Sequence, residues 1–145
     1  MMDTQKINDL NHGLCESGTL TDILLIDFKI LISSLEVFDT SALQALSPLA
    51  QVGIVKRMQM AADIFVDKTS PATVQALADH RSDTVRGIAA FATARLTSTD
   101  DVPTLLSAIK PFADDTHFGV REWAWLAVRD KLMASLGDSL IALVP

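Results

Sequence analysis

The chain has 145 residues, 49% of them hydrophobic, with a formal net charge of −6 at pH 7 and a pI near 4.8. This length favours a single domain that spans residues 1–145 and buries a core of its own, and the acidic balance argues against a general affinity for nucleic acid, because non-specific binding of phosphates needs a basic surface. The lone Cys15 excludes an internal disulfide and a multi-cysteine zinc site, and it favours a reducing cytoplasm.

The N-terminal segment is expected to be a short helix and not a targeting signal. Residues 3–12 predict a helix that ends at Gly13, a natural stop. The segment lacks a basic region followed by an apolar one. The richest apolar run, residues 23–35, is interrupted by Asp27 and Lys29 and is too short to cross a bilayer. We therefore expect a soluble protein with no membrane contact.

Two helices are expected in residues 19–50. Thr19 or Thr21 can cap a helix whose apolar residues continue, nearly all round, to Leu35. Such a helix should be buried on more than one side. The second helix reaches about residue 50, and Pro48 is expected to end or bend it.

The rest of the chain predicts helical pairs joined by short turns. Ser and Asp caps and early prolines mark the helix starts. The expected helices span residues 54–66, 71–80, 83–96, 103–112, 120–133 and 136–143. Because no stretch alternates over the length of a strand, the sequence predicts an all-α fold of about seven or eight helices.

Residues 77–94 and 112–129 carry the same pattern at an offset of 35 residues. The identical positions are Ala78/Ala113, Asp79/Asp114, Val85/Val120, Arg86/Arg121, Ala89/Ala124 and Ala92/Ala127. Self-similarity at this period is typical of a solenoid, whose units bury their apolar faces by stacking. The clearest repeats cover residues 70–97 and 102–133, and residues 19–66 are interpreted as degenerate repeats.

One stripe of the helix expected over residues 120–133 is a candidate binding surface. Arg121, Trp125 and Arg129 lie at i, i+4 and i+8, beside the face that the repeat identities mark as buried. A guanidinium can lie on an indole four residues away, and together they make a flat surface for a base, a sugar or a phosphate. Arg86 and Lys56 are expected to continue a basic row across neighbouring repeats, which could track the phosphates of DNA.

The same residues have a structural interpretation. An arginine at this position of a repeat can pair with the turn aspartate of its own or the adjacent repeat, here Asp79 or Asp114. Lys56 can be a solvated charge, and Trp125 fits either the core or an exposed cleft. His117 is expected as a turn cap or an exposed side chain.

The sequence predicts no metal, no cofactor and no assignable catalytic residue. His12 and Cys15 are three residues apart, but Gly13 breaks the helix between them and no third ligand is near. The aspartates at 100–101 and 114–115 lie at turns, where they are expected to cap helices. The sequence contains no glycine-rich phosphate loop, nucleophile elbow or HExxH motif.

Each repeat consists of a helix, a tight turn with Asp and a second helix that opens with Val-Arg. This pattern is similar to the HEAT-like repeats of helical solenoids. The segments SDTVRGIAAF and IKPFADDTHFGVREWAWLAVR resemble bacterial proteins of the DNA alkylation repair (alkylpurine DNA glycosylase-like) family, and residues 10–35 and 53–62 resemble its opening repeats. The resemblance implies a right-handed α-α superhelix that holds duplex DNA on its concave face. In active relatives it implies excision of N3- or N7-alkylated purines without metal or cofactor. The resemblance does not identify any residue of this chain as the family's catalytic aspartate.

Two functions follow from these patterns. A DNA-binding solenoid, with or without glycosylase activity, predicts that Lys56, Arg86, Arg121 and Arg129 face one concave surface with Trp125 exposed beside them. A non-catalytic scaffold for protein–protein interaction predicts that the arginines are engaged by acidic turn residues and that the concave face is neutral or acidic. The high apolar content also suggests that an apolar end of the stack meets a protein partner or a second copy of the chain, as a homodimer.

Overall fold

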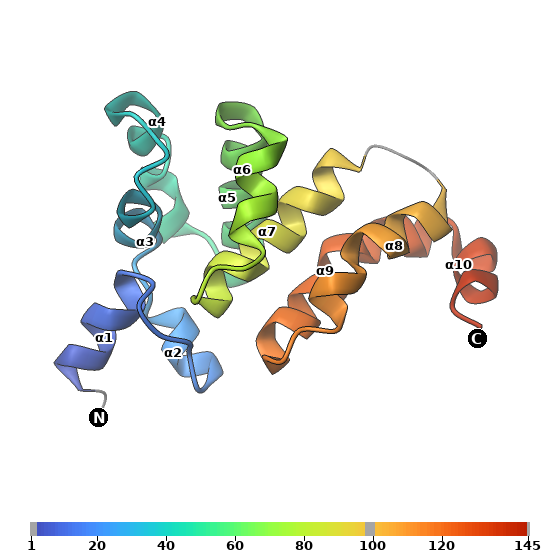
Figure 1. Ribbon diagram of the computed structural model, residues 1–145, viewed down its shortest axis with the longest axis horizontal. Coiled ribbons are helices and arrows are strands. Elements are labelled where there is room, and N and C mark those ends of the chain that lie inside the picture. Colours follow the sequence, from blue (N-terminus) through green and yellow to red (C-terminus); the bar gives the residue numbers. More distant parts are fainter. Residues whose placement is uncertain (1–2, 98–100, 145) are drawn as a thin grey trace.

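The computed structural model describes residues 3–97 and 101–144, and within these ranges it is all-helical, with no strand (Figure 1). The elements are α1 (Thr4–Asn11), α2 (Leu20–Leu24), α3 (Phe28–Ser34), α4 (Thr40–Gln44), the 3-10 helix η1 (Ser47–Gln51), α5 (Ile54–Lys68), α6 (Pro71–Leu77), α7 (Asp83–Leu96), α8 (Val102–Ala113), α9 (Phe118–Ala134) and α10 (Leu136–Ala142). The all-α prediction is confirmed. The predicted count of seven or eight helices is wrong, because the described residues contain ten α-helices.

The extra helices come from the N-terminal third of the chain. The single helix predicted to continue to Leu35 is divided into α2 and α3 at Asp27, whose backbone is extended and whose carboxylate accepts a hydrogen bond from the Ile30 N–H as the cap of α3. An Asp side chain competes well for free amides at a helix start, so a polar residue inside an apolar run begins a new helix. The next predicted helix is also divided, because Pro48 lies in the first turn of η1 and does not end a longer helix.

The helices after Gly53 lie close to their predicted positions. Ser70, Ser82 and Asp101 cap α6, α7 and α8, and each side chain accepts a hydrogen bond from an amide in the first turn of its helix. Pro71 lies in the first turn of α6, where its missing N–H costs nothing. These local signals therefore set the framework of the C-terminal two thirds of the chain.

Helix α7 lies at the centre of the molecule. It packs along α5 on one side and along α9 on the other, and α6 and α8 also contact it. Almost all of its side chains are buried, including Val85, Ile88 and Ala89, which have no exposed surface. A helix that is buried nearly all round must be central, and this position makes α7 the floor of the site described below.

The N-terminal helices form one end of the elongated molecule and α10 lies at the other (Figure 1). Helix α3 contacts α1, α4 and η1, and η1 packs against α5. Arg57 of α5 fixes this junction: its guanidinium donates to the carbonyls of Leu49 and Val52 and lies 5.4 Å from the centre of the Phe28 ring. Within residues 3–97 and 101–144, no helix combines the length and apolar character that a membrane crossing requires.

Candidate functional site

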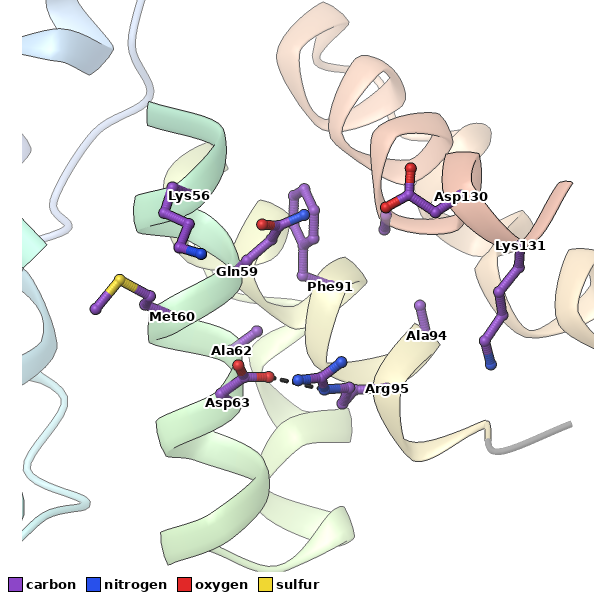
Figure 2. Close-up of a pocket in the computed structure, with 11 residues that line it drawn as sticks. Lys56, Gln59, Met60, Ala62, Asp63, Phe91, Ala94, Arg95, Asp130 and Lys131 are labelled. Atoms are coloured by element: carbon purple, nitrogen blue, oxygen red, sulfur yellow. Dashed lines mark ion pairs between the residues drawn. The ribbon is translucent and has the colours of Figure 1, made fainter. Parts of the chain in front are cut away.

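A groove of about 590 Å³ runs across α5, α7 and α9, and Figure 2 shows the side chains that line it. Its wall on α5 carries Lys56, and the wall on α9 carries Asp130. Between them, α7 contributes Phe91 and Ala94 to the floor. The remaining lining residues are Gln59, Met60, Ala62, Asp63, Arg95, Ala127 and Lys131.

Small side chains on the three helices leave the space for this groove. Ala62, Ala94 and Ala127 each line it from a different helix. Phe91, 6% exposed, is the aromatic residue among those that line the groove, and its ring packs against the Trp123 ring at a centroid distance of 6.1 Å. The groove can therefore accept an apolar side chain against a rigid aromatic floor.

The charges around the groove are mixed. Arg95 pairs with Asp63 at 2.8 Å, as Figure 2 shows, so one cation of the groove is already compensated. Lys131 donates to the carbonyl oxygen of Thr97 at 3.2 Å. Three cations and two carboxylates line the groove in total. Its surface is therefore close to neutral, in contrast to the basic row that the sequence pattern suggested.

Arg86 lies outside this groove, in a buried ion-pair cluster. It is 8% exposed, and its guanidinium donates to the Asp115 carboxylate at 2.9 and 3.1 Å and to Glu16. Burial raises the pKa of Asp115, but the hydrogen bonds from Arg86 and from the His117 N–H outweigh it and hold that pKa below its ordinary value. Arg86 is thus neutralised within the protein.

The aspartates predicted to pair with the repeat arginine Arg86 are not its partners in the structure. Arg86 uses Asp115 and Glu16, whereas Asp114 pairs with Lys110 at 3.3 Å. The sequence predicted a turn aspartate of the same or the adjacent repeat, Asp79 or Asp114, and the partner observed is Asp115, the residue next to Asp114. Glu16 carried no signal, because the loop before α2 reaches Arg86 only through the tertiary fold.

Arg121 repeats the backbone contacts of Arg86. Its guanidinium donates to the carbonyls of Asp115 and Thr116 at 2.8 and 3.0 Å, which lie six and five residues before it. Arg86 bonds to the carbonyls of His80 and Arg81 at the same spacing. Both arginines therefore close the turn that precedes their own helix, which gives the identity at this repeat position a structural cause.

Trp125 and Arg129 lie on the side of α9 that faces away from the groove. Trp125 is two residues from the groove-lining Ala127, a rotation of about 200° on a helix. Trp125 is 43% exposed, and the Arg129 side chain is 56% exposed with a loose ion pair to Asp130 at 3.6 Å. Lys56 therefore lies in the groove, Arg86 in the core, and the three stripe residues on α9 outside the groove. The fold does not bring them together on one concave surface.

A second buried cluster was missed by sequence reasoning. The fully buried Asp83 carboxylate accepts hydrogen bonds from the amide and hydroxyl of Ser17, and His117 contacts the Ser17 carbonyl at 2.7 Å. The other ring nitrogen of His117 accepts from the Gly119 N–H, so it caps α9 as expected, and the proton is assigned to Nε2. Because the histidine meets the serine carbonyl and not its hydroxyl, the cluster is a structural joint and not a nucleophile–base pair.

The expected caps at the acidic pairs are realised in part. Asp101 caps α8, and residue 100 lies outside the described residues. Asp115 caps no helix, because it binds Arg86 and accepts from the His117 N–H. In the part of the chain that the structure describes, no group of three or more His, Cys, Asp or Glu side chains is placed to hold a metal ion.

Comparisons of the chain with protein-family models, with curated proteins and with solved structures find no match.

Proposed function

We propose that the chain is a non-catalytic HEAT-like helical-repeat domain, a right-handed α-α superhelix, whose groove across α5, α7 and α9 binds a segment of another protein. The observation that carries this proposal is that the groove is nearly neutral. The repeat arginine Arg86 does not line it, because Arg86 forms ion pairs with Asp115 and Glu16. This is the arrangement that the scaffold alternative predicts. The 35-residue repeat and the matching contacts of Arg86 and Arg121 support the repeat architecture.

The groove defines the chemistry of the partner segment. Phe91 and the alanines of the floor favour an apolar side chain. Lys56 is exposed on the rim, and the structure gives it no ion pair within the described residues, so it favours a carboxylate beside that apolar group. We therefore propose a short segment that pairs an apolar anchor with an acidic residue.

Selection of displayed random peptides on the purified chain tests this proposal. The selected peptides should combine an apolar and an acidic residue, and in NMR titrations they should shift the amides of Gln59, Phe91 and Ala94. Lys56→Glu should weaken their binding by about tenfold or more, the loss typical of a contact residue that matters.

Lys110→Glu is the matched control, because Lys110 is an exposed lysine on α8, outside the groove. It should leave the affinity unchanged. Peptides that map to another surface, or that bind equally well to the Lys56→Glu variant, contradict the proposal.

Duplex DNA is the second candidate ligand. The resemblance to DNA alkylation repair proteins and the exposed stripe of Arg121, Trp125 and Arg129 favour it. The net charge of −6 and the compensated Arg86 oppose it. If this candidate holds, labelled duplex binds with an affinity that falls steeply with salt, and a duplex containing 7-methylguanine releases the free base. The absence of both, in chain that is folded by circular dichroism, eliminates the DNA candidate and leaves the peptide proposal untouched.

A further inference from the structure

One face of α9 is solvent-exposed along its whole length, on the side away from the groove. We call it the α9 end face and define it as Phe118, Glu122, Trp125, Arg129 and Met133, which recur every three or four residues and so share one side of the helix. All five are exposed, and its three apolar members are exposed by 47% (Phe118), 43% (Trp125) and 66% (Met133). Such a row of large apolar side chains in water is typical of an interaction surface.

The sequence repeat shows what this face does in the preceding helix. The α7 residues at an offset of 35 from Phe118, Glu122, Trp125 and Arg129 are all buried, and they are Asp83, Gly87, Ala90 and Ala94. Gly87 lies where α7 meets both neighbours, because a Cβ there would be 2.6 Å from Cδ1 of Trp123 on α9 and 2.7 Å from Cε of Met58 on α5. The α9 end face is thus the surface on which α9 would be packed by a further helix.

The last helix does not fill that position. Helix α10 contacts α8 and α9, and the Ser139 hydroxyl fixes it by donating to carbonyls at the end of α9 and in the following turn. It leaves the end face exposed, and α10 and the two residues after it add further exposed apolar side chains. These are Leu136, Leu140 and Ile141 of α10, followed by Leu143 and Val144.

The end face is complementary to itself in the antiparallel direction. The centre of the face lies between Trp125 and Leu126. Glu122 lies three residues before Trp125, and Arg129 lies three residues after Leu126. Phe118 lies seven residues before Trp125, and Met133 lies seven residues after Leu126, so both pairs share this centre. When two such helices are related by a two-fold axis at this centre, each Glu122 faces Arg129 of the other chain and each Phe118 faces Met133.

We propose that the occupant of the α9 end face is a second copy of this chain, which packs its own α9 antiparallel around a two-fold axis near Trp125. A two-fold interface brings the same patch of both subunits together, so opposite charges at equal distances on either side of the axis face each other. Two equivalent Glu122–Arg129 pairs then flank the two Trp125 rings at the axis. The interface lies on the opposite side of α9 from the groove and does not depend on the proposed peptide binding.

Charge reversal tests this arrangement in sedimentation equilibrium of the full chain. Wild type should have twice the protomer mass of 15.7 kDa. Glu122→Arg and Arg129→Glu each create two like-charge pairs and should weaken association by about 30-fold or more. Mixing the two single variants should restore a dimer, because all four facing positions are then complementary, and the double variant E122R/R129E should dimerise by itself.

Lys110→Glu is the control, since Lys110 is an exposed lysine on α8 and belongs neither to the groove nor to the α9 end face. It should dimerise like wild type, and all variants should keep the wild-type circular dichroism. A wild-type chain that stays monomeric at about 100 μM overturns the proposal and leaves the face to a different partner. So does a dimer that survives both single reversals, or two single variants that fail to associate when mixed.

Discussion

Arg86 joins three distant parts of the chain: its own helix α7, the loop before α2 through Glu16, and the turn before α9 through Asp115. Its desolvation is compensated by two carboxylates and two backbone carbonyls. Removal of Arg86 leaves the Asp115 carboxylate, whose side chain is only 13% exposed, without its partner, and this is more costly than the loss of a surface pair. The Glu16 side chain is 44% exposed and stays in contact with water.

Arg86→Met should therefore lower the free energy of unfolding by about 3–5 kcal/mol, as measured by urea denaturation. Arg95→Met, which removes the exposed pair with Asp63, should lower it by less than about 1 kcal/mol. If the methionine variant does not fold, Arg86→Lys should still show a loss larger than that of Arg95→Met. Equal losses at the two arginines would refute the role given to the buried cluster.

Asp115 makes this cluster sensitive to acid. Its pKa is lower in the folded protein than the unfolded value of about 3.9. The stability that it contributes is therefore complete above the unfolded value and is lost as the pH falls through the lower folded value.

Asp115→Asn should make stability depend less on pH between about 5 and 2, by at most about 1.4 kcal/mol per pH unit for one titrating group. Urea denaturation at several pH values measures this slope. Asp79→Asn, at an exposed carboxylate, should keep the wild-type slope. An unchanged slope for Asp115→Asn would show that the cluster does not titrate in this way.

Among the helices, the close approach of α7 to its neighbours depends on Gly87. A Cβ there would lie 2.6 Å from Cδ1 of Trp123 and 2.7 Å from Cε of Met58. The methionine end can move, but the indole is held in the core and is 5% exposed. The contact between α7 and α9 therefore requires glycine at this position, although glycine is a poor helix former.

Gly87→Ala should lower the free energy of unfolding by about 1–2 kcal/mol, because overpacking outweighs the gain in helix propensity. In the Trp123→Leu background the same change should cost less, as a double-mutant cycle in urea would measure. Gly137→Ala in α10 is the control: apart from the neighbouring residues and backbone of its own helix, no atom of the described residues lies within 4 Å of the position that the added methyl group would take. The change should therefore be neutral or slightly stabilising.

For the protein in its entirety, self-association through the α9 end face makes stability depend on protein concentration. Dimerisation favours the folded state by mass action. The Tm of wild type should rise by about 2 °C for each tenfold increase in concentration of a chain of this size, as scanning calorimetry would measure. The Tm of Glu122→Arg should not change with concentration, and a wild-type Tm that is equally constant would contradict the dimer.

The helical class and most of the helices after Gly53 could be predicted from the amino-acid sequence, because caps, prolines and apolar spacing act within a few residues. The repeat and the arginine that recurs in it were also visible there. The prediction failed in residues 19–50, where Asp27 and Pro48 start new elements inside apolar runs.

Which charges are available for binding became clear only from the tertiary structure. Arg86, Arg121 and Lys56 look alike in the sequence, but their surroundings differ. Arg86 is buried and paired with carboxylates, Arg121 closes a turn, and Lys56 lines the groove. Their surroundings come from residues up to 70 positions away, as Glu16 is from Arg86. Spacing along one helix specifies the side on which a charge lies, but burial and pairing depend on what the rest of the chain packs against that side.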